Sequence, residues 1–79
     1  MPRTIYSDEH ERLCALLRRL RHDAGLTQVE LSQRLGRSQS FVSKYEQGQR
    51  RLDLIELEEI ALALGTTLEK VVRRFVRAR

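Results

Sequence analysis

Cysteine is nearly absent from the sequence, and Cys14 alone cannot form an internal disulfide bond. No stretch approaches the about 18 apolar residues of a membrane span, and the N-terminal MPRTIYSDEH lacks the apolar segment of a signal peptide. His10 and His22 do not stand at metal-ligand spacing, and no Cys-His, Ser-His-Asp or paired-carboxylate set indicates a catalytic centre. We therefore expect a cytoplasmic protein that is not an enzyme and uses no metal or cofactor.

The chain has 79 residues, of which 41% are hydrophobic, enough for one small core. We expect a single domain over residues 1–79 with its core at about 8–77. The net charge of +4 and the pI near 10.0 favour a polyanionic partner. In residues 31–52 Glu46 is the only acid among five bases, whereas residues 53–69 carry five acids and no base. A basic surface is thus expected beside an acidic one.

Helical periodicity and helix-end signals predict five helices. Apolar residues at helical spacing from Leu13 to Ala24 predict a first helix from about Asp8 to Ala24. The second ends near Leu35, and glycines follow each of the first four. No run alternates with period two over the length of a strand, so the predicted fold is all-α. The expected caps of the later helices are Thr27 with Glu30, Ser38, Asp53 with Glu56, and Thr66 with Glu69.

The third predicted helix has an outward face without a carboxylate. Val42 and Tyr45 define its inward side, with Gln39 and Phe41 at the flanks. A face of hydroxyls, amides and one cation suits the donors and acceptors of DNA base edges, although an ordinary solvated surface is the alternative. The outward side chains are Ser40, Ser43, Lys44 and Gln47.

Two short helices joined by a turn that contains Gly36 form a helix-turn-helix pattern. The segment LTQVELSQRLGRSQSFVSKYEQGQR resembles the DNA-binding motif of the lambda-repressor-like (Cro/repressor, or XRE) family, and residues from about 10 to 76 resemble its whole domain. The resemblance implies that Gln28 contacts a phosphate and braces Gln39. It also implies base reading by Gln39, Ser40, Ser43 and Lys44.

Phosphate contacts are expected where helix N-termini present free N–H groups. The side chains that would assist are Gln28, Arg37, Arg50 and Arg51. Glu46 falls about 40° from Val42 and so near the inward side of its helix, where an acid needs a partner. In the resembling repressors an arginine late in the first helix pairs with this glutamate, and Arg21 occupies that place.

Four other residues have more modest expected roles. Phe41 is expected at the rim of the core, with contact to a thymine methyl as the alternative. Cys14 is expected to be a small packing residue, and both His10 and His22 are expected on the surface of the first helix.

The fourth predicted helix is apolar around more than half of its circumference, leaving mainly Glu56 and Glu59 outside. The surplus could be covered by the fifth helix or by a second copy of the protein, and we favour a homodimer. Its candidate contacts are Leu54, Ile55, Leu62, Phe75 and Val76. The terminal arginines, which either solvate the end or reach phosphates, are Arg73, Arg74, Arg77 and Arg79.

These features predict a sequence-specific regulator of transcription that binds double-stranded DNA as a dimer at a near-palindromic operator, as a repressor or autoregulator. An antitoxin that holds a toxin on its apolar helices, or another protein-binding module, is the alternative. A restriction–modification controller would share the mechanism and differ in gene context.

Overall fold

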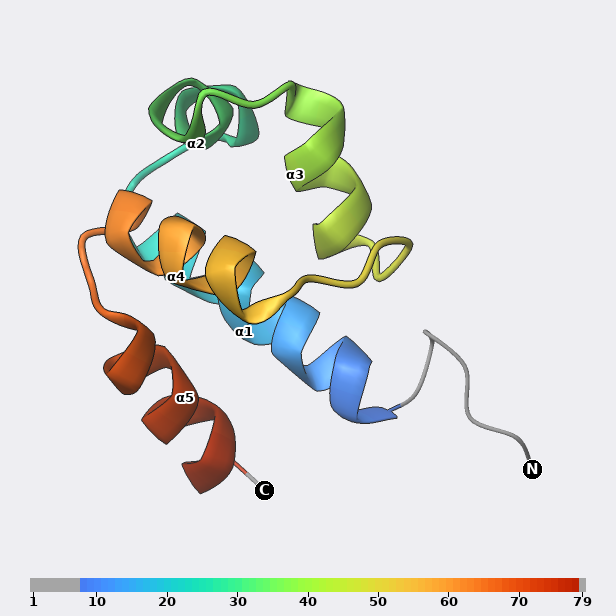
Figure 1. Ribbon diagram of the computed structural model, residues 1–79, viewed down its shortest axis with the longest axis vertical. Helices are drawn as coiled ribbons and strands as arrows, with labels where there is room; N and C mark the ends of the chain where they lie inside the picture. The colour runs from blue at the N-terminus through green and yellow to red at the C-terminus, as the bar shows by residue number, and fades with distance from the viewer. Residues whose placement is uncertain (1–7, 79) are drawn as a thin grey trace.

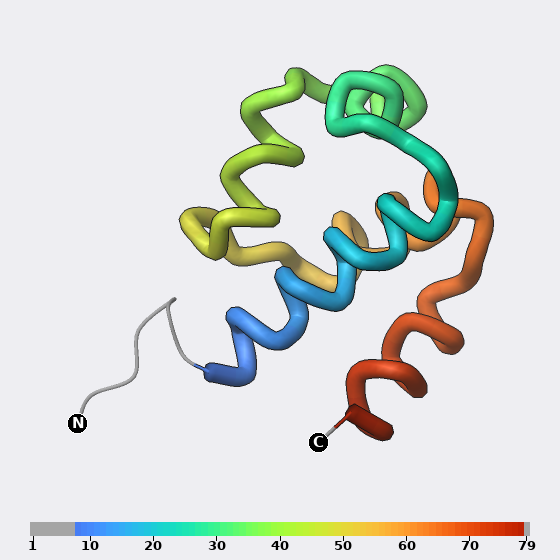
Figure 2. Tube along the Cα trace, turned by 180° about the vertical axis from the view of Figure 1, so that it is seen from behind, coloured from blue at the N-terminus to red at the C-terminus, as the bar shows by residue number. Residues whose placement is uncertain are grey.

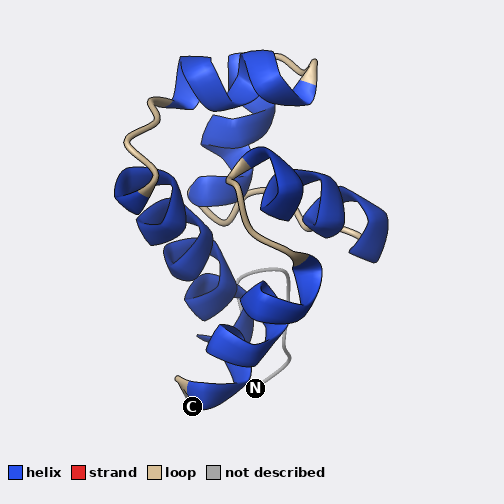
Figure 3. Cartoon of the chain, turned by 90° about the vertical axis from the view of Figure 1, so that its left-hand side faces the viewer, coloured by secondary structure: helices blue, strands red, loops and turns tan. Residues whose placement is uncertain are grey.

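The computed structural model describes residues 8–78, which form five helices and no strand (Figures 1 and 3). The predicted all-α fold is therefore confirmed. Residues 1–7 and Arg79 lie outside the described range, as do the expectations for the N-terminal segment and the last arginine. None of the described helices combines the length and the apolar character needed to cross a membrane. The helices are α1 (Asp8–Asp23), α2 (Gln28–Leu35), α3 (Gln39–Glu46), α4 (Leu54–Ala63) and α5 (Leu68–Arg77).

The helices surround one core to which each of them contributes. Figure 1 shows α2 and α3 together at one end and α5 at the other, with α1 and α4 crossing between them, and Figure 2 shows α1 from behind. Each helix buries the apolar side chains that face the other helices. The largest fully buried side chains are Leu17, Leu31, Val42, Tyr45, Ile60 and Val71.

Capping boxes begin α2 and α4 as predicted. Thr27 N donates to Glu30 Oε1 at 2.9 Å and Glu30 N donates to Thr27 Oγ1 at 3.1 Å. Asp53 and Glu56 form the same reciprocal pair, at 3.0 and 2.7 Å. These bonds satisfy N–H groups that have no partner inside the helix.

The predicted cap of α5, Thr66 with Glu69, is wrong. Thr67 is the N-cap, and its hydroxyl accepts from Lys70 N at 3.2 Å. Thr66 belongs instead to the turn that closes α4, because its N–H donates to Ala61 O at 3.0 Å beyond the left-handed Gly65. Because Thr66 is used in closing α4, the neighbouring Thr67 caps α5.

The turn between α2 and α3 depends on Gly36, whose φ of 68° lies in the left-handed region that favours glycine. Arg37 N then donates to Ser32 O at 3.0 Å, closing α2. Ser38 caps α3 immediately afterwards. This short connection fixes the direction of α3 relative to α2.

His10 is buried, which corrects the prediction that both histidines lie on the surface of the first helix; His22 is exposed as predicted. The loop after α3 covers this part of α1, and His10 Nε2 lies 3.3 Å from Gly48 O. Cys14 is also buried, with Sγ 3.7 Å from the same nitrogen, so its packing role is confirmed. Helical periodicity located the side of α1 that faces other helices, but it did not locate a loop packed beside that side.

Candidate nucleic-acid interface

The four residues predicted to read bases lie together on α3, at the end of the molecule that α2 and α3 form (Figure 1). Gln39, Ser40 and Lys44 are exposed, and Ser43 is half-buried. Ser40 Oγ lies 3.0 Å from Ser38 Oγ, and Gln47 Nε2 donates to Ser43 Oγ at 3.4 Å. The described outward face thus presents hydroxyl, amide and ammonium groups and no carboxylate.

Two salt-bridge clusters hold α3. The first joins Arg21 of α1 to Glu46 of α3, with Arg21 Nε donating to Glu46 Oε2 at 2.7 Å and Nη2 donating to Oε1 at 3.0 Å. The expected ion pair is therefore present, and its side chains are only 9% and 2% exposed. The hydrogen bond to Glu46 raises the pKa of Arg21. Arg21 Nη1 also donates to Leu26 O at 2.8 Å, which ties the start of α2 to the pair.

Gln28 joins the same cluster, because its Nε2 donates to Glu46 Oε1 at 3.0 Å. The family resemblance implied a phosphate and Gln39 as the partners of Gln28, and this bond was not expected. An amide has two N–H donors and an oxygen, so Gln28 retains groups for a further contact. The observed bond orients Gln28 at the N-terminus of α2.

The second cluster surrounds Phe41 and was not predicted. Phe41 is 8% exposed and packs edge-on against Tyr45, with ring centroids 5.5 Å apart, so the predicted position at the rim of the core is confirmed. The guanidinium carbons of Arg37 and Arg50 lie 4.5 and 4.7 Å from the centroid of its ring. Phe41 therefore supports two of the four residues predicted to contact phosphates.

Glu56 links these arginines to α4, which corrects the prediction that its side chain lies on the solvent-exposed side of the helix. Arg50 Nη1 and Nη2 donate to its two carboxylate oxygens at 3.1 and 2.8 Å, and Arg37 Nη1 lies 3.6 Å away. Its side chain is 12% exposed, whereas Glu59 is exposed as predicted, at 55%. The hydrogen bonds from Arg50 and then from Asp53 N lower the pKa of Glu56 to about 2.

This low pKa predicts a loss of stability in acid. The pKa of Glu56 is below the value of about 4.3 that glutamate has in an unfolded chain, so its stabilising contribution is complete above that pH. The contribution should disappear as the pH falls towards about 2. The free energy of unfolding, measured from pH 5 to 2 in urea, should fall less steeply for Glu56→Gln than for the unchanged protein. Equal slopes would contradict the prediction.

Arg51 completes the predicted phosphate contacts. Its side chain is exposed, and its carbonyl oxygen accepts from Arg50 Nη1 at 2.9 Å. Arg37, Arg50 and Arg51 thus lie on the two connections that flank α3, while Gln28 begins α2. Three of these residues therefore adjoin α3 in the chain, and Gln28 contacts α3 through Glu46.

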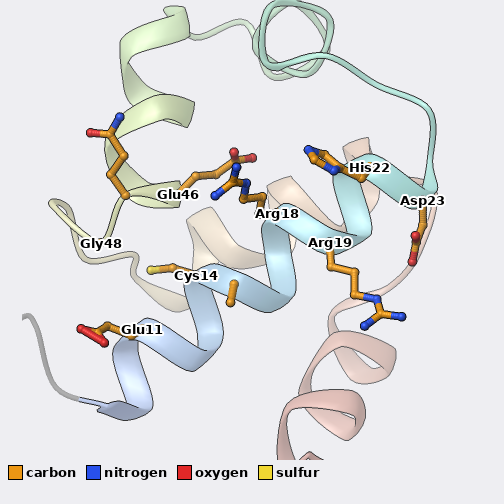
Figure 4. Close-up of a pocket in the computed structure, with 10 residues that line it drawn as sticks. Glu11, Cys14, Arg18, Arg19, His22, Asp23, Glu46 and Gly48 are labelled. Carbon is orange, nitrogen blue, oxygen red and sulfur yellow. The ribbon is translucent and has the colours of Figure 1, made fainter.

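A groove of about 480 Å³ lies between α1 and the C-terminal end of α3 (Figure 4). Arg18 and His22 line it from α1, and Gln47 and Gly48 line it from the opposite side. Cys14 points into this region, and burial raises the pKa of its thiol, so the thiol stays protonated near neutral pH. Among residues 8–78, no three His, Cys, Asp or Glu side chains are arranged to bind a metal ion.

The predicted dimer contacts lie on α4 and α5. Leu54, Ile55 and Leu62 are 66%, 72% and 61% exposed, so α5 does not cover the surplus apolar surface of α4. Val76 is also exposed, whereas Phe75 is half-buried. Phe75 has an unpredicted partner within the chain: the guanidinium carbon of Arg12 lies 4.0 Å from its ring centroid, and Arg12 Nη1 donates to Phe75 O at 2.8 Å.

Comparison with known proteins identifies similar chains. Residues 12–77 match the family model described as a helix-turn-helix domain. An uncharacterized HTH-type transcriptional regulator, y4dJ, from Sinorhizobium fredii (strain NBRC 101917 / NGR234) is 44% identical over 54 residues, which cover 68% of this chain and 70% of that protein.

Two solved structures are similar over most of their length. An XRE-family like protein from Pseudomonas syringae pv. tomato str. DC3000 has 41% identity and a TM-score of 0.82, and the match covers 89% of this chain and 85% of that one. The restriction-modification controller protein C.AhdI from Aeromonas hydrophila has 32% identity and a TM-score of 0.75, with 84% and 98% covered.

Proposed function

Because the chain belongs to the XRE-type helix-turn-helix family of DNA-binding transcription regulators, we propose that it binds a near-palindromic operator as a homodimer. It acts in the cytoplasm as a repressor or autoregulator. The observation that carries this proposal is the outward face of α3, where Gln39, Ser40, Ser43 and Lys44 lie together without a carboxylate. A carboxylate there would face the negative field of the phosphates.

The reading residues differ in the information they extract. Gln39 can pair with adenine through two hydrogen bonds, and Lys44 can donate to the acceptors of guanine. Ser40 and Ser43 add weaker contacts, since a hydroxyl can donate or accept. Base preference is therefore expected to depend chiefly on Gln39 and Lys44.

The flanking residues hold the protein in register on the DNA. Gln28 at the N-terminus of α2 and the arginines 37, 50 and 51 donate to phosphates, which carry no sequence information themselves. The helix dipole adds positive potential at the starts of α2 and α4. These contacts give affinity for every duplex, and α3 selects among them.

The exposed apolar surface of α4 and α5 supports the homodimer. Ile55 and Leu62 are seven residues apart and so lie on one side of α4, while Val72 and Val76 are four apart on α5. Burying these side chains against a second copy would remove apolar area from water. A two-fold dimer would set two copies of α3 about 34 Å apart, one turn of DNA.

Leu62→Glu is expected to weaken the dimer about tenfold or more, because a buried leucine contributes roughly 1.5–3 kcal/mol and a carboxylate resists burial. Sedimentation equilibrium at micromolar concentration measures the effect. Val29→Glu is the matched control, since Val29 is an exposed apolar residue on α2. A mass of one chain for the unchanged protein, with and without DNA, would contradict the dimer.

The same apolar surface supports a second candidate, an antitoxin that binds a toxin there and uses DNA for autoregulation. A protein that copurifies with the chain and is displaced by Leu62→Glu would favour it. In that case the unchanged protein alone should sediment as a single chain.

Selection of bound duplexes from a randomised DNA pool, at near-physiological salt, tests the proposed function. An enriched inverted repeat with half-sites one helical turn apart is the expected result. Enrichment of a single half-site would retain DNA reading and reject the dimer on DNA. No enrichment would reject sequence-specific binding, because any basic protein attracts DNA without preference.

A further inference from the structure

Arg37 and Arg50 reach the same point from opposite ends of α3. Arg37 precedes the helix and Arg50 follows it, yet both guanidinium groups lie against the ring of Phe41. Glu56, in the first turn of α4, bonds to Arg50 and lies near Arg37. One carboxylate therefore orients two cations that lie beside the reading helix.

Arg50 keeps one edge of its guanidinium available. Its Nη1 donates to Arg51 O and to Glu56 Oε1, and its Nη2 donates to Glu56 Oε2. A guanidinium has five N–H donors, so the Nε–H and the second Nη2–H have no acceptor among the described residues. These two donors project from a single edge, which matches two oxygens of a phosphate. The side chain is 37% exposed, which allows such an approach.

Glu56 is itself held in place. Its Oε1 accepts from Asp53 N at 3.0 Å, and its own N–H donates to Asp53 Oδ1 at 2.7 Å. The capping box fixes the carboxylate relative to α4, and the two-point bond then fixes Arg50 relative to the carboxylate. A free arginine would lose rotamer entropy on binding a phosphate, whereas this one is already ordered.

We propose that Glu56 is a positioning residue for DNA binding, which holds the guanidinium of Arg50 by one edge so that the other edge can take a backbone phosphate. Phe41 supports the same arrangement through its ring. This inference rests on the proposed function, because it requires that Arg50 meets DNA.

Removal of the Glu56 carboxylate should change the affinity for DNA in the direction opposite to that expected from charge alone. Removing a carboxylate near DNA should strengthen binding to every duplex, because it removes repulsion from the phosphates. If Glu56 positions Arg50, its removal should weaken binding instead. The direction of the change therefore separates the two accounts.

Glu56→Gln and Glu59→Gln form a matched pair for this test. Both substitutions remove one charge from α4, and glutamine at position 56 can still cap the helix. The side-chain amide of that glutamine, however, replaces one carboxylate oxygen with an NH2 group, which cannot accept a hydrogen bond from Arg50. Glu59 is 55% exposed, and its Oε1 lies 3.7 Å from Arg37 Nη2. Affinity for the duplex enriched by the unchanged protein is expected to fall about fivefold for Glu56→Gln, the loss of about 1 kcal/mol from one ordered contact. For Glu59→Gln it should stay equal or rise.

A double-mutant cycle tests whether Glu56 acts through Arg50. In an Arg50→Ala background, Glu56→Gln should cause a much smaller loss, because the guanidinium that Glu56 bonds at two points is gone and only Arg37, 3.6 Å away, remains. Arg50→Lys, which keeps the charge but loses the planar fork, should lose about as much affinity as Arg50→Ala. If circular dichroism shows that Glu56→Gln does not fold, Arg50→Lys still tests whether the oriented guanidinium is needed for binding.

Three outcomes would overturn the inference alone: Glu56→Gln binding as tightly as the unchanged protein or more tightly, an equal loss in the Arg50→Ala background, or full affinity for Arg50→Lys. If the unchanged protein enriches no duplex, the proposed function fails and the inference fails with it. Melting temperatures measured alongside distinguish a loss of binding from a loss of folding.

Discussion

Glu46→Ala is expected to lower the free energy of unfolding by about 3–5 kcal/mol, because it leaves a buried guanidinium without its carboxylate. Arg21 donates two hydrogen bonds to Glu46, and its side chain is only 9% exposed. Gln28 would lose its acceptor as well. Urea unfolding followed by circular dichroism measures the change.

Glu59→Ala provides the control, since it removes an exposed carboxylate and should cost less than about 1 kcal/mol. Combining Glu46→Ala with Arg21→Met should recover part of the loss, because no unpaired buried charge remains. An unchanged melting temperature for Glu46→Ala would show that the guanidinium finds another partner or water, and would contradict the assigned role.

Gln39→Ala and Lys44→Ala are each expected to cost about 1–3 kcal/mol of operator affinity and to relax base preference at one step of each half-site. Both side chains are exposed, and neither takes part in the Glu46 or Glu56 clusters. Their loss should therefore leave the melting temperature unchanged. Repeating the duplex selection with each variant shows which base position becomes degenerate.

Arg50→Ala should differ in kind from these two variants. It should weaken binding to all duplexes alike and reduce the slope of log affinity against log salt by about 1, because it removes a phosphate contact. If all three variants lowered affinity uniformly across sequences, the division between base-reading and phosphate-contacting residues would be wrong. Equal salt slopes for Arg50→Ala and the unchanged protein would remove Arg50 from the phosphate contacts.

The predictable parts of the structure are those that short-range chemistry determines. The boxes of Thr27 and Asp53 each involve residues three positions apart, so the sequence contains both partners. The inward side of α3 follows from 100° per residue, which located Val42 and Tyr45 in the core. Arg21 was paired with Glu46 through a family resemblance, since nothing in the sequence joins residues 25 positions apart.

The unpredicted parts depend on loops and on contacts between distant residues. His10 is buried by the loop that contains Gly48, which its own helical periodicity does not describe. Glu56 satisfied a helix-cap pattern, and the distribution of apolar residues around α4 placed it on the solvent-facing side. Its second role required Arg50 to fold back from six residues upstream onto the ring of Phe41. A basic residue near a cap glutamate was the available signal, but Phe41 was expected at the rim of the core or against a thymine methyl, and not as a support for arginine side chains.

The two salt-bridge clusters hold α3 without using the side chains on its outward face. Glu46 fastens the helix to α1 and α2, and Glu56 fastens its flanking arginines to α4. Ser40 and Ser43, by contrast, bond to Ser38 and Gln47 close by on the same segment. Substitutions on the outward face should therefore leave the stability of the fold nearly unchanged, so that several of them can accumulate one after another. A lineage of such proteins could acquire new target sites by drift, and a library randomised at positions 39, 40, 43 and 44 should consist mostly of folded members.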